Sequence, residues 1–184
     1  MIKIKAYLKV TVLFFTSYYT QAQCEVFKSE ITDVQKYMLQ VSQLTDSLST
    51  AAETASYDAR LSTARTNTKT VMLLMGQAVT AADEAVILAS EAQYDSENCG
   101  LEEAISYTID AERNAIDARD FASEAFENVK SASRSKNLGN LQFHMRKAQR
   151  ILRAVRNSAE ASAYAADNAH YSCSHDMDHA SLDR

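Results

Sequence analysis

Hydrophobic and small residues recur along this chain in alternating steps of three and four, in four successive segments. This spacing places side chains on one face of an α-helix, so each segment is predicted to be a long amphipathic helix. The predicted core positions of the first segment are Cys24, Phe27, Ile31, Val34, Met38, Val41, Thr45, Leu48, Ala52 and Ala55. Those of the second are Val71, Leu74, Ala78, Ala81, Ala85, Leu88, Ala92, Asp95 and Cys99.

The last two segments continue the same rhythm after short polar connections. Their predicted core positions are Leu101, Ala104, Thr108, Ala111, Ala115, Ala118, Ala122, Ala125, Val129 and Ala132, and then Leu141, Met145, Ala148, Leu152, Val155, Ala159, Ser162, Ala166, Ala169 and Cys173. A polar stretch at residues 63–70 leads into the second segment, with Asp58 as the expected N-cap, and Gly100 suits a left-handed helix stop after it. The third turn is expected within residues 133–140.

Composition agrees with an all-α fold. The 184 residues include three glycines and no proline, whereas alanine, the best helix former, occurs 29 times. Short connections make neighbouring helices antiparallel, so the prediction is an up-down-up-down four-helix bundle with coiled-coil-like, alanine-rich seams and little interior space for a cofactor. A shift of 77 residues lays Asp33 on Asp110 and Tyr94 on Tyr171, which slightly favours duplication of one helical hairpin.

The first 22 residues have the pattern of a secretory signal peptide. Lys3, Lys5 and Lys9 precede an apolar and aromatic stretch at residues 10–19, and cleavage is expected after Ala22. The apolar stretch is too short for a membrane anchor, which needs about 20 residues. Lipidation of Cys24 is an alternative, but Gln23 is large and polar for that kind of cleavage site. Cleavage would leave a bundle over residues 23–173 and a polar tail over 174–184, and would change the formal charge from −5 to −8.

Three cysteines mark the same end of the predicted bundle. Cys24 opens the first helix, Cys99 closes the second and Cys173 closes the fourth. Because an exported chain meets an oxidising compartment, we expect one disulfide among them, with Cys99–Cys173 as the first choice and Cys24–Cys99 as the rival.

Two stretches are candidates for binding. The C-terminal run His170, Cys173, His175, Met177 and His179 offers nitrogen and sulfur donors for copper or zinc, although a solvated tail with a structural cysteine is the ordinary explanation of such a run. Residues 128–159 contain eight basic residues and no Asp or Glu. Within them Arg146, Lys147, Arg150, Arg153 and Arg156 form a patch that is expected to hold an anionic glycan, lipid head group or acidic partner. The alternative is that this face pairs with Asp110, Glu112, Asp117 and Asp120 of the third helix.

No motif for catalysis accompanies these features. The chain has no Gly-rich phosphate loop, no Gly-x-Ser-x-Gly elbow and no Glu-x-x-His pair for a di-iron site. Nucleic acid is a poor partner for an exported acidic chain. The sequence therefore predicts a non-catalytic periplasmic or secreted bundle without a cofactor, acting as a structural or protein-interaction module of the cell envelope and able to self-associate. The alternative is an envelope protein that handles copper or zinc.

Overall fold

The computed structural model describes the backbone of residues 2–99 and 102–182 and the side chains of residues 24–99 and 102–174. It contains four helices: α1 (Ile2–Tyr57), α2 (Leu61–Cys99), α3 (Glu102–Arg134) and α4 (Leu138–Leu182). Only residues 58–60 and 135–137 of the described backbone lie outside them, and this part of the chain has no strand. The all-helical prediction is confirmed.

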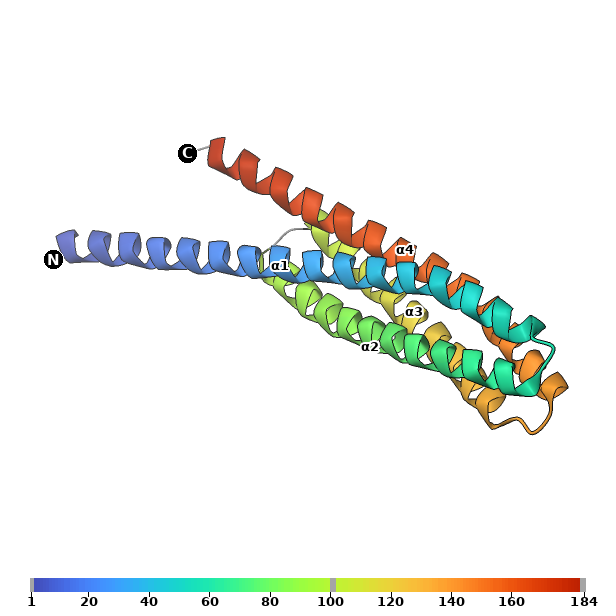
Figure 1. The fold of residues 1–184 in the computed structure, drawn as a ribbon. Helices are drawn as coiled ribbons and strands as arrows, with labels where there is room; N and C mark the ends of the chain where they lie inside the picture. The colour runs from blue at the N-terminus through green and yellow to red at the C-terminus, as the bar shows by residue number, and fades with distance from the viewer. Residues whose placement is uncertain (1, 100–101, 183–184) are drawn as a thin grey trace.

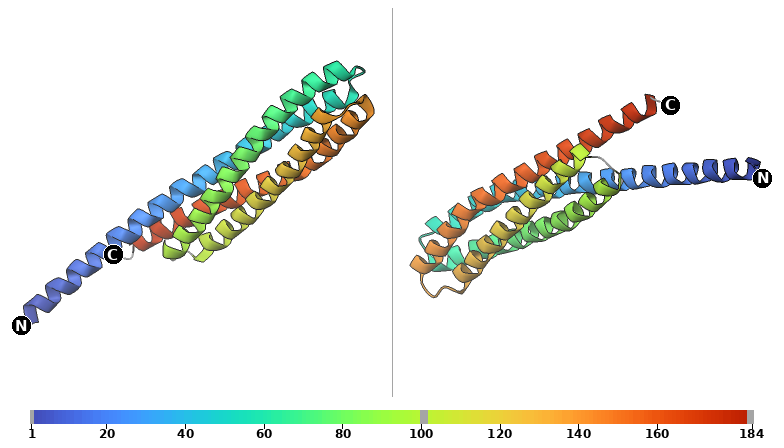
Figure 2. Two further views of the ribbon diagram at one scale, coloured as in Figure 1. Left: turned by 90° about the horizontal axis from the view of Figure 1, so that it is seen from below. Right: turned by 180° about the vertical axis from the view of Figure 1, so that it is seen from behind.

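The helices form a bundle in which each packs against two others. The closely packed pairs are α1 with α2, α2 with α3, α3 with α4 and α4 with α1, whereas the diagonal pairs α1–α3 and α2–α4 barely touch. The α1–α2 and α3–α4 connections lie together at one end of the molecule, which we call the loop end, and both termini lie toward the other end (Figure 1). Figure 2 shows the first part of α1 extending past the other three helices.

Burial follows the predicted rhythm in three of the four helices. Every predicted core position of α1 and α4 is buried, as is every one of α3 except Leu101, which lies outside the described residues. In α2 the prediction was wrong at four of the nine positions: Leu74, Leu88, Asp95 and Cys99 are only half-buried. Their C-terminal neighbours Met75 and Ala89, and likewise Ser96, are buried instead.

Helix α2 begins two residues later than an N-cap at Asp58 would place it. It starts at Leu61, so the polar stretch at 63–70 is part of the helix and Asp58 is not its N-cap. The hydroxyls of Thr66 and Thr68 donate to the carbonyls of Ser62 and Ala64 over 3.2 and 2.8 Å. Threonine satisfies its hydroxyl on the preceding turn in this way, so the polar run continues the helix.

The two hairpins repeat each other with an offset of 77 residues. Helix α1 ends at Tyr57 and α3 at Arg134, while α2 begins at Leu61 and α4 at Leu138. The hydrogen bonds between the hairpin loops follow the same offset: Arg65 Nη2 donates to the Ser135 carbonyl (2.9 Å) and Gln142 Nε2 donates to the Asp58 carbonyl (3.0 Å). Each hairpin therefore supplies one hydrogen-bond donor to the loop of the other, and these two bonds connect the hairpins at the loop end.

Candidate functional site

Three arginines form an exposed stripe on α4. Arg146, Arg150 and Arg153 are separated by four and three residues, so they lie on one helix face, and all three are exposed. Among the described residues, none has a carboxylate within ion-pairing distance or a side-chain hydrogen bond. We call these residues the arginine stripe. It carries three charges that the described part of the chain leaves without a carboxylate partner.

The two other residues of the predicted basic patch each form an ion pair within the chain. Lys147 Nζ lies 3.6 Å from Glu124 of α3. Arg156 contacts Asp46 of α1 over 2.8 Å and Glu160 over 2.7 Å. The hydrogen bond from Arg156 is the main reason that the pKa of Glu160 lies below its usual value, and the same bond raises the pKa of Arg156. Arg156 thus ties α4 to α1.

The acidic residues expected to neutralise this face are occupied elsewhere or stand apart from it. Asp110 pairs with Arg113 over 3.6 Å and Asp120 with Arg119 over 2.7 Å, both within α3. Glu112 and Asp117 have no ion pair in the described part of the chain. The pairing alternative therefore applies to Lys147 alone, through Glu124.

A large aromatic ring accompanies the arginine stripe. Phe143, one turn before Arg146, is 63% exposed, and its ring packs edge-on against His144 with the centroids 5.3 Å apart. His144 Nδ1 is buried and has no hydrogen-bond partner in the described structure. An exposed phenyl ring next to uncompensated arginines is a surface composition enriched at protein interfaces.

The structure brings the three cysteines together at the end opposite the loops. Cys24 and Cys173 are buried and Cys99 is half-buried, and all three are thiols. Burial raises the pKa of the Cys99 thiol, and a hydrogen bond with Cys24 and the proximity of Cys24, Cys173 and Asp95 raise it further. These contacts join α1, α2 and α4 at what we call the cysteine end. The Cys24 and Cys99 side chains are in hydrogen-bond contact, as the rival pairing requires.

A carboxylate cluster beside the cysteine end was missed in the sequence. Burial raises the pKa of Glu30 on α1 to about 7, and Asp95 and Glu91 of α2 add to the effect. Glu30 Oε2 is buried without a hydrogen-bond partner. The only signal in the sequence was that Glu30 directly precedes the core position Ile31, so that helix packing turns it toward α2.

The predicted metal-binding run is only partly within the described residues. Cys173 is buried in the bundle and His170 is half-buried, whereas His175, Met177 and His179 lie outside the residues whose side chains are described. Among the described side chains, no group of three His, Cys, Asp or Glu residues is arranged to hold a metal ion. The backbone of α4 remains helical through Leu182, beyond the expected start of the tail at residue 174.

No protein-family model, curated protein sequence or solved structure matches the chain.

Proposed function

We propose that this protein is an exported, non-catalytic helical bundle that binds an anionic partner in the cell envelope through the arginine stripe. The observation that carries the proposal is the exposure of Arg146, Arg150 and Arg153 without any carboxylate partner among the described residues. Basic residues concentrated on one face, in a chain that is acidic overall, attract anions through a local positive potential.

Export is proposed from the N-terminal sequence and is compatible with the fold. Cys24 is the first of the ten predicted core positions of α1, so cleavage after Ala22 would remove none of them. The thiols of Cys24 and Cys99 are in contact at the end of the first hairpin. We propose that this pair forms a disulfide when the protein reaches an oxidising compartment.

We also propose that the bundle has up-down-up-down antiparallel topology and arose by duplication of one hairpin. Three features support this proposal: the contacts between successive helices, the identical offset of the helix ends and the reciprocal loop hydrogen bonds. In this topology the arginine stripe lies toward the loop end, away from the cysteines.

The test uses protein recovered from the exported fraction after expression of the full chain. The variant Arg146→Gln/Arg150→Gln/Arg153→Gln is compared with the control Lys36→Gln/Arg113→Gln/Arg119→Gln, which removes the same charge from cations that already have a carboxylate partner. The probe is co-sedimentation with phosphatidylglycerol vesicles, with phosphatidylcholine vesicles as the neutral reference.

We expect the stripe variant to bind the anionic vesicles about a hundredfold more weakly than the parent, at about 1 kcal/mol per basic residue, while the control binds like the parent. Its free energy of unfolding should stay within about 1 kcal/mol of the parent, because exposed charges contribute little to stability. Equal binding by stripe variant and control would contradict the proposal, as would a stripe variant that melts several degrees lower and still sediments like the parent.

A further inference from the structure

Helix α2 exposes apolar side chains on the face that points away from the bundle. Leu73, Ile87 and Tyr94 are 66%, 53% and 67% exposed, and with Thr80 they recur every seven residues along one side of the helix. One 18-residue window of α2 reaches a mean hydropathy of 1.5 with 33% of it buried, which is long and apolar enough to span a membrane by length and composition. We call Leu73, Thr80, Ile87 and Tyr94 the α2 stripe.

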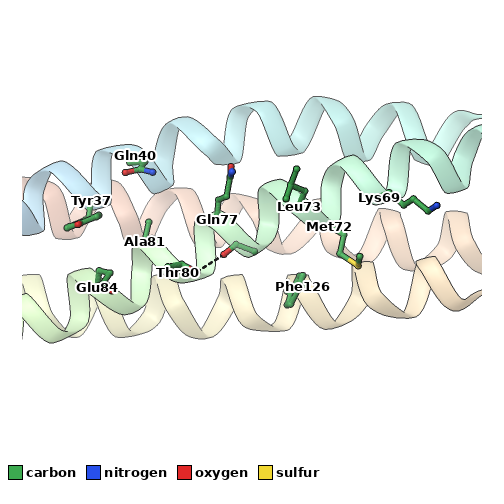
Figure 3. A pocket seen from close by; sticks show the side chains of 11 residues that line it. Tyr37, Gln40, Lys69, Met72, Leu73, Gln77, Thr80, Ala81, Glu84 and Phe126 are labelled. Atoms are coloured by element: carbon green, nitrogen blue, oxygen red, sulfur yellow. Dashed lines mark hydrogen bonds between the residues drawn. The ribbon is translucent and has the colours of Figure 1, made fainter.

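A groove runs beside the α2 stripe. It has a volume of about 980 Å³ and is lined by Leu73, Gly76 and Thr80 of α2, by Tyr37 of α1 and by Phe126 of α3. In the close view of Figure 3, Tyr37 and Phe126 lie on either side of α2, so the groove has an aromatic ring on each flank.

Packing within the described bundle does not require a glycine at position 76. A Cβ atom built there meets nothing within 4 Å, so a larger residue would fit. Glycine inside a helix lowers stability relative to alanine because its unfolded chain has more freedom. A glycine facing open space in the middle of an exposed stripe is suited to the close approach of another helix.

The charges of α2 between the groove and the cysteine end are acidic, whereas lysines surround the groove itself. Lys69 lines it, and Lys36 and Lys130 lie over the rings of Tyr37 and Phe126. Between residues 70 and 99 the chain has no Lys or Arg, and Asp83, Glu84 and Glu91 are exposed without an ion pair among the described residues. Helix α4 carries the arginine stripe, and α2 and α4 barely touch. The bundle therefore has an acidic, apolar edge and a basic edge on different sides.

We propose that the outer face of α2 is the docking site for α4 of a second copy of this chain, so that the anionic partner of the arginine stripe is the protein itself. This inference rests on the proposed function and names its partner. The acids of α2 lie toward the cysteine end and the arginines of α4 toward the loop end, so the second copy docks inverted.

The spacing of the two stripes is compatible with this inverted arrangement. Placing Arg150 over the ring of Tyr94 brings Tyr164, 70% exposed and fourteen residues further along α4, to the level of Thr80, fourteen residues back along α2. Arginine over tyrosine is a favourable cation–π pair, and Tyr164 then reaches the groove next to Gly76. Because the two docking faces lie on different edges, each copy keeps one face open and the contact propagates from copy to copy.

The experiment is sedimentation velocity over a concentration series, on protein recovered from the exported fraction, at low ionic strength and at about 0.15 M salt. The parent is expected to associate with rising concentration and to dissociate with salt. Two variants remove one partner each: Glu91→Lys/Glu97→Lys on α2, two exposed acids that this register sets level with the arginine stripe, and Arg146→Glu/Arg150→Glu/Arg153→Glu on α4. The control Glu53→Lys/Asp117→Lys makes the same charge change at two exposed positions of α1 and α3 that have no ion pair among the described residues.

Each of the two variants should associate about tenfold more weakly than the parent or worse, the control should associate like the parent, and a mixture of the two variants should associate again because its charges are complementary. Gly76→Gln should weaken association while Gly76→Ala folds at least as well as the parent. Circular dichroism of every variant establishes that it is folded.

A parent that stays monomeric at all concentrations overturns this inference, and so does association that the α2 and α4 variants leave unchanged. Retained binding of the arginine stripe to phosphatidylglycerol vesicles in that case leaves the proposed function standing, so the two failures are separable. Binding of a monomeric parent to phosphatidylcholine vesicles that Ile87→Lys abolishes would assign the α2 stripe to a membrane and would also overturn the inference.

Discussion

Helices α1 and α3 occupy equivalent places in the two hairpins but fill the core in opposite ways. Their predicted core positions coincide after the 77-residue offset, from Phe27 and Ala104 to Ala55 and Ala132, and all of these are buried. On α1 these positions include the large side chains Phe27, Ile31, Val34, Met38, Val41 and Leu48, whereas on α3 seven of them are Ala104, Ala111, Ala115, Ala118, Ala122, Ala125 and Ala132.

The difference shows how one register can accommodate unequal volumes. Helices α1 and α3 lie diagonally across the bundle, so we expect the large side chains of α1 to fill space that the alanines of α3 leave open. Alanine on α3 also lets its backbone approach α4 closely. Removal of volume should therefore be costly on α1, and addition of volume should be costly on α3.

The largest effect should come from truncating an α1 core side chain. Phe27 is fully buried, so Phe27→Ala is expected to lower the free energy of unfolding by about 3–5 kcal/mol, through lost burial and a residual cavity. Chemical denaturation followed by circular dichroism measures this change. The neighbouring Val26 is 48% exposed, so Val26→Ala should change stability by roughly 0.5 kcal/mol or less. Similar losses for both variants would contradict the placement of the α1 core.

Enlarging the α3 core should have a smaller effect of the same sign. Met38 and Ala115 are equivalent positions and both are fully buried. Ala115→Met should cost about 1–3 kcal/mol by overpacking, while the same change at the exposed Ala161 should be nearly neutral. If volume is shared across the diagonal, the double variant Met38→Ala/Ala115→Met should cost less than the sum of the single changes. Additive costs would show that the two positions do not share space.

Spacing alone predicted the core of α1, α3 and α4 because each of these helices has one apolar face. It failed at four positions of α2, because Leu73, Leu74 and Met75, and again Ile87, Leu88 and Ala89, offer three adjacent phases of the same 3-4 rhythm and only the last of each run is buried. The side chains buried in that helix are largely small, so size could not identify the inward phase.

The candidate sites depended on contacts between distant residues. The sequence located Arg146, Arg150 and Arg153, but it could not show that Arg156 is held by Asp46, 110 residues away. It also placed the cysteines at one end, but it could not show the hydrogen bond between Cys24 and Cys99. The Glu30 cluster was missed because its acids come from two helices whose relative rotation is set only by packing.

Glu30 is also where the comparison of α1 with α3 breaks down, since its equivalent on α3 is the half-buried Tyr107. Burial, with Asp95 and Glu91 nearby, raises the pKa of Glu30 from 4.5 to about 7. A raised pKa means that between pH 4.5 and 7 the folded protein holds a proton that the unfolded chain has lost. This contribution to stability is therefore full below that interval, falls as the pH rises through it, and is absent above it.

Glu30→Gln removes the charge and should flatten this dependence. The variant is expected to be more stable than the parent at pH 8, on the order of 1 kcal/mol because the side chain is partly solvated, and about equal to it near pH 4. Thermal melting at a series of pH values measures the difference. Glu25→Gln, which neutralises an exposed carboxylate on the same helix, should keep the slope of the parent. A parent whose stability rises between pH 5 and 7 by an amount that Glu30→Gln abolishes would mean that Glu30 is stabilised as a carboxylate, and the unfavourable burial inferred for it would be wrong.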